Sequence, residues 1–162
     1  MARQFARLKM TQHQHQLIRE TFQHAERISP IFALTFYQRL FHLDPTLRAM
    51  FHSDIAEQSR ALMQSLRMLV ESVDRFEEVV GVVESLGRRH AGYGVRDEHY
   101  DTVGAALLWT FGHALGDSFP PDAREAWAQM YECIATTMKR AASFQTVPKG
   151  VPPYNVVRER NG

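Results

Sequence analysis

The chain has one cysteine, Cys133, among its 162 residues, which excludes an internal disulfide framework and a zinc site built from several cysteines. It has no apolar run that approaches the roughly 20 residues needed to cross a bilayer, and its amino terminus has no hydrophobic signal core. An excess of one charge is missing too, because 19 Lys and Arg are interspersed with 18 Asp and Glu. These absences argue against a nucleic-acid partner and a membrane span, and they favour a cytoplasmic protein.

The residues that are present predict an all-α fold around one core. Strand-like alternation is absent, whereas apolar residues recur at three and four positions, the spacing of one helix face. Thr11 and Gln14 form a capping-box pattern at the first helix, and Ser29 with Pro30 is expected to cap and open the second. Further helical segments are expected to begin near Pro45, Gln58, Phe76, Asp97 (as a cap) and Pro121, and glycines at 92, 94 and 116 are expected to end two of them.

The two ends of the chain differ from this helical body. Residues 1–10 are basic with scattered apolar residues, so we expect an N-terminal extension that packs little, the alternative being a weak contact with a membrane surface. Residues 144–162 contain three prolines and cannot continue a helix, so we expect a flexible C-terminal tail. The expected domain therefore covers residues 11–143.

His90 shares an apolar helical face with Leu86. By itself, a histidine on an apolar face is more often a satisfied core or boundary residue than a ligand, so periodicity leaves both interpretations open. Nucleophilic catalysis has little support, because the chain has no GxSxG elbow and Cys133 is expected in mid-helix and partly buried. The glycines also form no phosphate-binding loop.

Five stretches occur in a fixed order along the chain. They are FYQRLFHLDPTLRAMF (36–51), QSRAL (58–62), LGRRHAGYGV (86–95), EHYDTVGAALL (98–108) and AWAQMYECIA (126–135). In this order and spacing the chain resembles the bacterial single-domain globins, which are related to the haem domain of flavohaemoglobins. The resemblance covers about residues 11–142 and implies a globin fold, a helical sandwich around a haem pocket, with haem b as the cofactor.

The resemblance also implies roles for individual residues. His90 matches the proximal histidine that ligates the haem iron, while Tyr37 and Gln58 match distal residues that stabilise a bound ligand. The other cofactor-binding residues it implies are Phe51 against the porphyrin, Leu62 on the distal wall, Leu86, Val103 against the haem, Tyr100 beside the proximal ligand, and Arg89 or Arg88 near a propionate, unless these are surface arginines.

The sequence departs from flavohaemoglobins at Ala142, where their globin domain has a glutamate that bonds to the proximal histidine. We therefore expect the N–H of His90 to bond to a backbone carbonyl one turn back, near Leu86, and we expect no peroxidase-like activation. Only 20 residues follow Ala142, too few for a flavin reductase domain, so an external reductase is the expected electron source. His52 follows Phe51 and is expected in a loop rather than on the iron.

These residues imply a haem-binding globin that binds dioxygen tightly and also binds nitric oxide and carbon monoxide. Hydrogen bonds from Tyr37 and Gln58 to a charged ligand would contribute roughly 1.5 to 3 kcal/mol each. Slow release suits nitric-oxide detoxification by dioxygenation, with electrons supplied in trans, better than it suits a carrier. The alternative is a non-enzymatic dioxygen-binding or gas-sensing module. A helical bundle that has lost haem is disfavoured because His90 and the distal set are all present.

Overall fold

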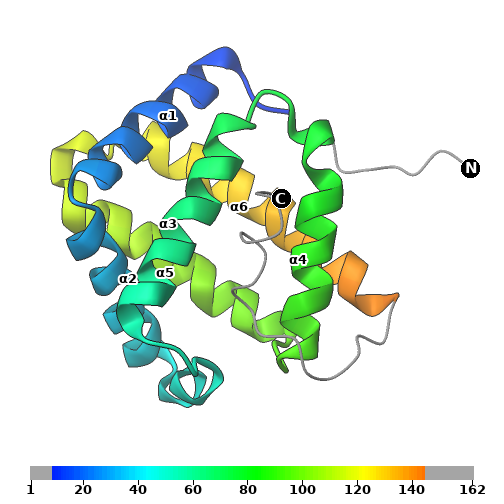
Figure 1. Cartoon of the computed structure of the whole chain (residues 1–162). Helices are drawn as coiled ribbons and strands as arrows, with labels where there is room; N and C mark the ends of the chain where they lie inside the picture. Colours follow the sequence, from blue (N-terminus) through cyan, green and yellow to red (C-terminus); the bar gives the residue numbers. More distant parts are fainter. Residues whose placement is uncertain (1–8, 145–162) are drawn as a thin grey trace, which may run out of the picture.

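The computed structural model describes residues 9–144, and this part of the chain is built from helices and turns with no strand (Figure 1). The predicted all-α class is confirmed. No helix between residues 9 and 144 is long and apolar enough to span a bilayer. The expected extension 1–10 and tail 144–162 lie almost wholly outside the described residues and stay predictions.

The described part of the chain has six α-helices and three short 3-10 helices. The α-helices are α1 (Gln12–Arg27), α2 (Ser29–Leu43), α3 (Ile55–Glu71), α4 (Val80–Gly92), α5 (Asp97–Leu115) and α6 (Pro121–Ser143), with the 3-10 helices η1 (Pro45–Met50), η2 (Phe76–Glu78) and η3 (Gly116–Ser118).

The start of α1 is as predicted, and the start of α2 is not. Thr11 and Gln14 form the reciprocal capping box. The expectation that Ser29 caps α2 is wrong, because Ser29 already lies in the helix and Ile28 is the N-cap without a side-chain bond. Ile28 is also the last cap of α1, and its N–H bonds to the Ala25 carbonyl. The chain therefore passes from one helix to the next with no linker residue that could hold a separate cap.

The expectation that Asp97 caps α5 is also wrong. Arg96 is the N-cap, and its backbone N–H donates to Nδ1 of His99 at 3.0 Å. The imidazole of His99, at the third position of the helix, thus accepts from the N-cap backbone as a Glu or Gln does in a capping box. The predicted glycine stops are confirmed, because α4 ends at Gly92 and Gly94 follows it with a positive φ of 86°, a conformation that favours glycine.

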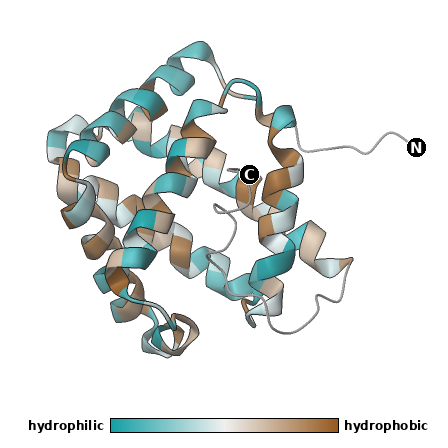
Figure 2. Ribbon diagram, viewed as in Figure 1, coloured by the Kyte–Doolittle hydropathy of each residue, from teal (hydrophilic) through white to brown (hydrophobic). Residues whose placement is uncertain are grey.

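The core lies where α1, α2, α5 and α6 meet. Trp127 and Phe111 are fully buried there, with ring centroids 4.3 Å apart. The indole N–H of Trp127 donates to the Thr21 hydroxyl at 2.8 Å, so the one polar atom of this ring is satisfied. Figure 2 shows the outer face of α1 as largely hydrophilic, which is the amphipathic pattern that its sequence predicts.

Helices α3 and α4 stand on either side of the molecule's centre and do not pack closely on each other (Figure 1). Instead α3 packs on α1 and α2, while α4 packs on α6. The α4–α6 contact is close because of Gly87, where an added Cβ would lie 2.4 Å from the Met138 carbonyl oxygen. The fold thus holds two helices apart, each supported from behind by another helix.

Candidate functional site

His90 is the first candidate residue, and the structure fixes its tautomer. Its Nδ1 lies 2.7 Å from the backbone oxygen of Leu86. Since a carbonyl can only accept, Nδ1 carries the proton and donates it, which leaves the lone pair on Nε2. Burial lowers the pKa of His90, while the bond to Leu86 opposes part of that shift. A neutral imidazole with a free Nε2 is the form that ligates a metal, and the expected bond to Leu86 is confirmed.

The end of α4 holds the backbone of His90 in place. The carbonyl of His90 accepts bonds from the backbone N–H groups of Tyr93, at 3.1 Å, and Val95, at 3.0 Å. These bonds satisfy a carbonyl that a helix end would otherwise leave open. One turn earlier, Gly87 anchors α4 against α6. The proximal candidate is therefore fixed by backbone contacts on both sides.

Tyr37 is the centre of a second group of residues, at the junction of α2, η1 and α3. It is 5% exposed, and its ring meets the ring of Phe51 edge-on at a centroid distance of 5.6 Å. Phe41 lies against both rings, at 6.0 Å from Tyr37 and 5.4 Å from Phe51. The hydroxyl of Tyr37 donates to the backbone oxygen of Gln58 at 3.1 Å. Burial raises the pKa of Tyr37, so the hydroxyl keeps its proton.

The side chain of Gln58 is buried and also has a partner within the protein. Its Nε2 donates to the hydroxyl of Ser53, in the turn just before α3. Tyr37 and Gln58 are thus brought together, but both have donors engaged by the chain itself. Sequence reasoning missed Ser53, because a serine before a helix looks like an ordinary cap neighbour.

The apolar residues expected around a cofactor share one property. Phe51, Leu62, Leu86 and Val103 all pack against the hydrophobic core, yet each remains partly exposed. Leu62 lies on α3 and Leu86 on α4, the two helices that the fold holds apart. Partial exposure of apolar side chains on both helices is what the walls of a slot for a flat apolar molecule require.

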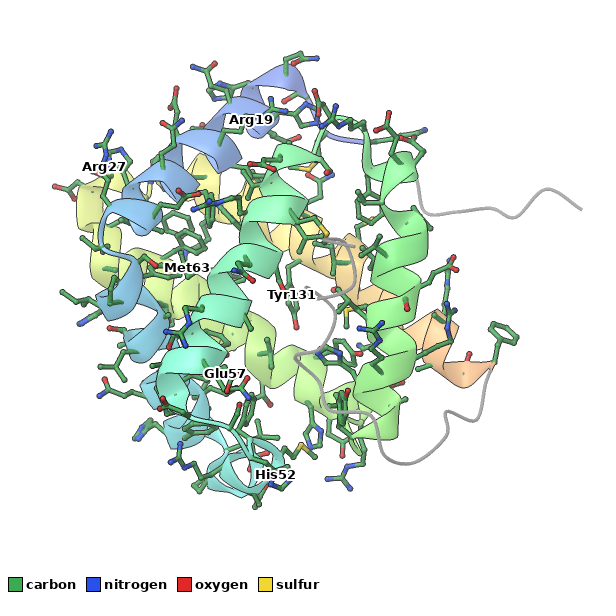
Figure 3. The ribbon with its side chains drawn as sticks, viewed as in Figure 1. Arg19, Arg27, His52, Glu57, Met63 and Tyr131 are labelled. Atoms are coloured by element: carbon green, nitrogen blue, oxygen red, sulfur yellow. The ribbon has the colours of Figure 1, made fainter. Side chains whose placement is uncertain are left out.

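Tyr100 and Arg88 each have partners within the protein. Tyr100 is buried, and its described contacts are with α6: Lys139 lies 5.5 Å over its ring, and its carbonyl accepts the hydroxyl proton of Tyr131. Its expected place beside His90 stays a prediction. Sequence reasoning missed Tyr131, which lies between α3 and α4 in Figure 3. Arg88 pairs with Glu84 at 3.9 Å.

Two further positions bear on the ligand set. Arg89 is partly exposed and has no ion pair within residues 9–144, so of the two arginines it is the one free to meet a carboxylate. His52 is exposed in the loop between η1 and α3, as expected (Figure 3).

The metal-ligating side chains of the site fit a metal ion that already has most of its ligands from another molecule. No group of three or more His, Cys, Asp or Glu side chains in the described part of the chain could hold a bare metal ion. His90, on the helix that faces α3 across the molecule's centre, offers a free Nε2 lone pair in a buried setting. A porphyrin supplies four nitrogen ligands and a large apolar face, so one neutral histidine and apolar walls fit haem. Such a fold and site define a haem-binding globin.

The comparisons with known proteins give the family directly. A family model described as Globin matches residues 34–138, and the chain belongs to the globin family. It is 30% identical over 129 residues to a flavohemoprotein of Vibrio cholerae, covering 78% of this chain and 33% of that protein. A flavohemoprotein of Bacillus subtilis is 32% identical over 116 residues, covering 70% of this chain and 28% of that protein. The chain is a bacterial globin related to flavohaemoglobin haem domains, and it spans about a third of the length of these relatives.

Two solved structures share the fold. One is described as an engineered carbene transferase, a putative nitric oxide dioxygenase from Rhodothermus marinus, with a TM-score of 0.74 and 21% identity, covering 83% of this chain and 94% of that one. The other is a bacterial globin from Campylobacter jejuni, with a TM-score of 0.71 and 24% identity, covering 82% and 96%. The predicted globin fold is confirmed, and the family implies haem as cofactor and small diatomic gases as ligands.

Proposed function

We propose that this globin holds haem b, binds dioxygen tightly, and converts nitric oxide to nitrate with electrons supplied in trans. The observation that carries the proposal is the state of His90. Its imidazole is neutral, its Nδ1 proton is committed to Leu86, and its Nε2 lone pair is available to iron. The family gives the cofactor class, and the residues present accept it.

The chain's own residues would hold the group from both sides. His90 would ligate the iron, and the apolar side chains of Phe51, Leu62, Leu86 and Val103 would cover the porphyrin. Haem, when bound, supplies an iron that takes up dioxygen, nitric oxide or carbon monoxide. Arg89 would meet a propionate, because it has no competing ion pair in the described structure.

The distal residues would set how long dioxygen stays. The hydroxyl proton of Tyr37 points to the Gln58 carbonyl, and rotation about the C–O bond would turn it toward a ligand. A neutral hydrogen bond is worth about 1 kcal/mol, and a bond to a charged acceptor about 1.5 to 3. The gain from Tyr37 is therefore the difference, about 0.5 to 2 kcal/mol, because one bond must break before the other forms.

The reaction balances with one electron from outside. One nitric oxide, one dioxygen and one electron give one nitrate ion, so every turnover needs a reductase. The relatives named flavohemoproteins are about three times as long as the segment matched here, and their name couples a haem to a flavin. That likeness supports a flavin reductase as the electron donor.

The test is nitric-oxide consumption under air with a reductase added. Sustained consumption with nitrate formed in equal amount would support the enzyme. A single turnover despite a working reductase would overturn it and favour the alternative, a non-enzymatic dioxygen-binding or gas-sensing module. An absorption spectrum that lacks a Soret band after haemin is added would overturn both functions.

A further inference from the structure

A cavity of about 320 Å³ that is open to solvent lies on the outer side of α2 and α5 and plays no part in the proposed haem site. Its volume is at the lower end of the range of small-molecule sites, which is about 300 to 1,000 Å³. Four of its lining residues share one face of α2 at spacings of three and four, and two lie one turn apart on α5. The lining residues are Thr35, Gln38, Arg39, His42, Trp109 and His113.

The lining is rich in hydrogen-bond donors and has no carboxylate. Arg39 carries a permanent positive charge, and His42 and His113 each offer at least one ring N–H at any protonation state. Thr35 and Gln38 add a hydroxyl and an amide. An anion entering this cavity would therefore meet one fixed positive charge and several donors, and no opposing negative group.

The guanidinium of Arg39 is held in place but has no acceptor among the described residues. It lies 4.5 Å over the ring of Trp109, whose other neighbour is the ring of His113, stacked at 4.6 Å and 10°. The Nε of Arg39 is shielded from solvent and has no hydrogen-bond partner in residues 9–144. No ion pair to Arg39 exists in the same part of the chain. No described group offsets the charge of this guanidinium, so an anion in the cavity would meet an uncompensated positive charge.

We infer that this cavity binds the oxyanion group of a small organic molecule, a phosphate monoester or a carboxylate. The planar guanidinium, fixed over Trp109, matches the paired oxygens of either group. The site is separate from the haem site, because Arg39 and Tyr37 are two residues apart on α2 and so project in different directions. Tyr37 is buried among aromatic rings, whereas Arg39 lines the outer cavity.

The two tryptophans make the site measurable. Trp109 lines the cavity, while Trp127 is fully buried and bonded to Thr21. In the ¹⁵N-labelled carbon-monoxide form of the protein, inorganic phosphate or citrate at millimolar concentration should shift the Trp109 indole signal and leave the Trp127 signal in place. Trp109→Phe assigns the two signals. A larger response to phosphate than to citrate identifies a phosphate ligand, and the reverse identifies a carboxylate.

Arg39→Gln should weaken binding at least about tenfold, since it replaces a charge-assisted contact by a neutral one. Arg48→Gln is the matched control, because Arg48 also lies over an aromatic ring, at 5.3 Å from Phe41, but does not line the cavity. His113→Ala should weaken binding about threefold with the fold intact. The inference is overturned if neither probe shifts the Trp109 signal, if both indole signals move together, or if Arg39→Gln and Arg48→Gln bind alike.

Discussion

Around His90 the structure offers one side-chain hydrogen bond, from Nδ1 to the Leu86 carbonyl, whereas around Tyr37 it offers a cluster of aromatic rings and two linked hydrogen bonds. The proximal bond ends on the backbone of the same helix. The distal bonds end on Gln58 and Ser53, which belong to α3 and to the turn before it. The distal hydrogen bonds therefore involve side chains that can change partner, whereas the proximal acceptor is held in a helix backbone.

This difference locates the control of reactivity. A backbone carbonyl is a neutral acceptor, and it leaves the imidazole less electron-rich than a carboxylate would. Ala142 provides no such carboxylate. The distal donors are side chains whose bonds can be exchanged for bonds to a ligand. We therefore expect proximal changes to decide whether haem is held, and distal changes to decide how fast a ligand leaves.

The largest expected effect comes from His90→Ala. Without the Nε2 lone pair the iron has no protein ligand, so the spectrum of a histidine-ligated haem should be lost, and added imidazole should restore it. The absorption spectrum and the haem content of purified protein measure this. His52→Ala is the control, because His52 is exposed in its loop and should leave the spectrum unchanged. A normal spectrum in His90→Ala would show that another residue is the ligand.

Gly87→Ala tests the support of the proximal helix. The new methyl group would meet the Met138 backbone, so we expect a loss of about 1 to 3 kcal/mol in the free energy of unfolding and weaker haem retention. Gly81→Ala, in the first turn of the same helix, has no atom within 4 Å of the new Cβ and should leave the stability unchanged or raise it by less than about 1 kcal/mol. Urea denaturation compares the two, and equal stability of both variants would contradict the close contact.

Tyr37→Phe tests the distal side without changing the ring. Dioxygen dissociation should become about tenfold faster, since the donor is lost while the aromatic cluster remains. Stopped-flow displacement of dioxygen by carbon monoxide measures the rate. Tyr131→Phe should change that rate less than about twofold, because its hydroxyl lies at the Tyr100 carbonyl of α5 rather than beside Gln58. An unchanged rate in Tyr37→Phe would remove this residue from the distal site.

Ser53→Ala should have a smaller effect in the opposite direction. Releasing the Gln58 amide from Ser53 frees a donor for the ligand, so dissociation of dioxygen should slow about twofold to fivefold. Ser59→Ala, on the first turns of α3, is the control and should leave the rate unchanged. Faster dissociation in Ser53→Ala would mean that Ser53 holds Gln58 in its working position instead.

The smallest expected effect is that of pH on dissociation. Loss of the Tyr37 proton would remove the donor and place a negative charge in the pocket, which would speed release. Burial raises the pKa of this hydroxyl above its ordinary value of 10.0, so the proton stays on throughout the neutral and mildly alkaline range. The dissociation rate should therefore be flat from neutral pH to pH 9 or so. A rise in the rate within this range would show that the hydroxyl titrates.

Local patterns of sequence were sufficient for the helices and for the bond of His90. The capping box at Thr11 and the stops at Gly92 and Gly116 depend on residues close in sequence, and so does a bond from His90 to the carbonyl four residues earlier. The expected caps at Ser29 and Asp97 were each wrong by one residue. Each of these residues is already the first residue of its helix, and the N-cap is the residue before it, Ile28 or Arg96.

The sequence by itself determined an all-helical chain, the ordered set of residues that marks a globin, and the proximal histidine with its neutral acceptor. Only the tertiary structure decided which residues far apart in the sequence are in contact. It brought Tyr37 to the backbone of Gln58 rather than to open space, closed α4 on α6 at Gly87, and placed Arg39 over Trp109 beside a cavity. The physical reason is that helix formation depends on neighbours within about four residues, whereas these contacts depend on how packed helices meet.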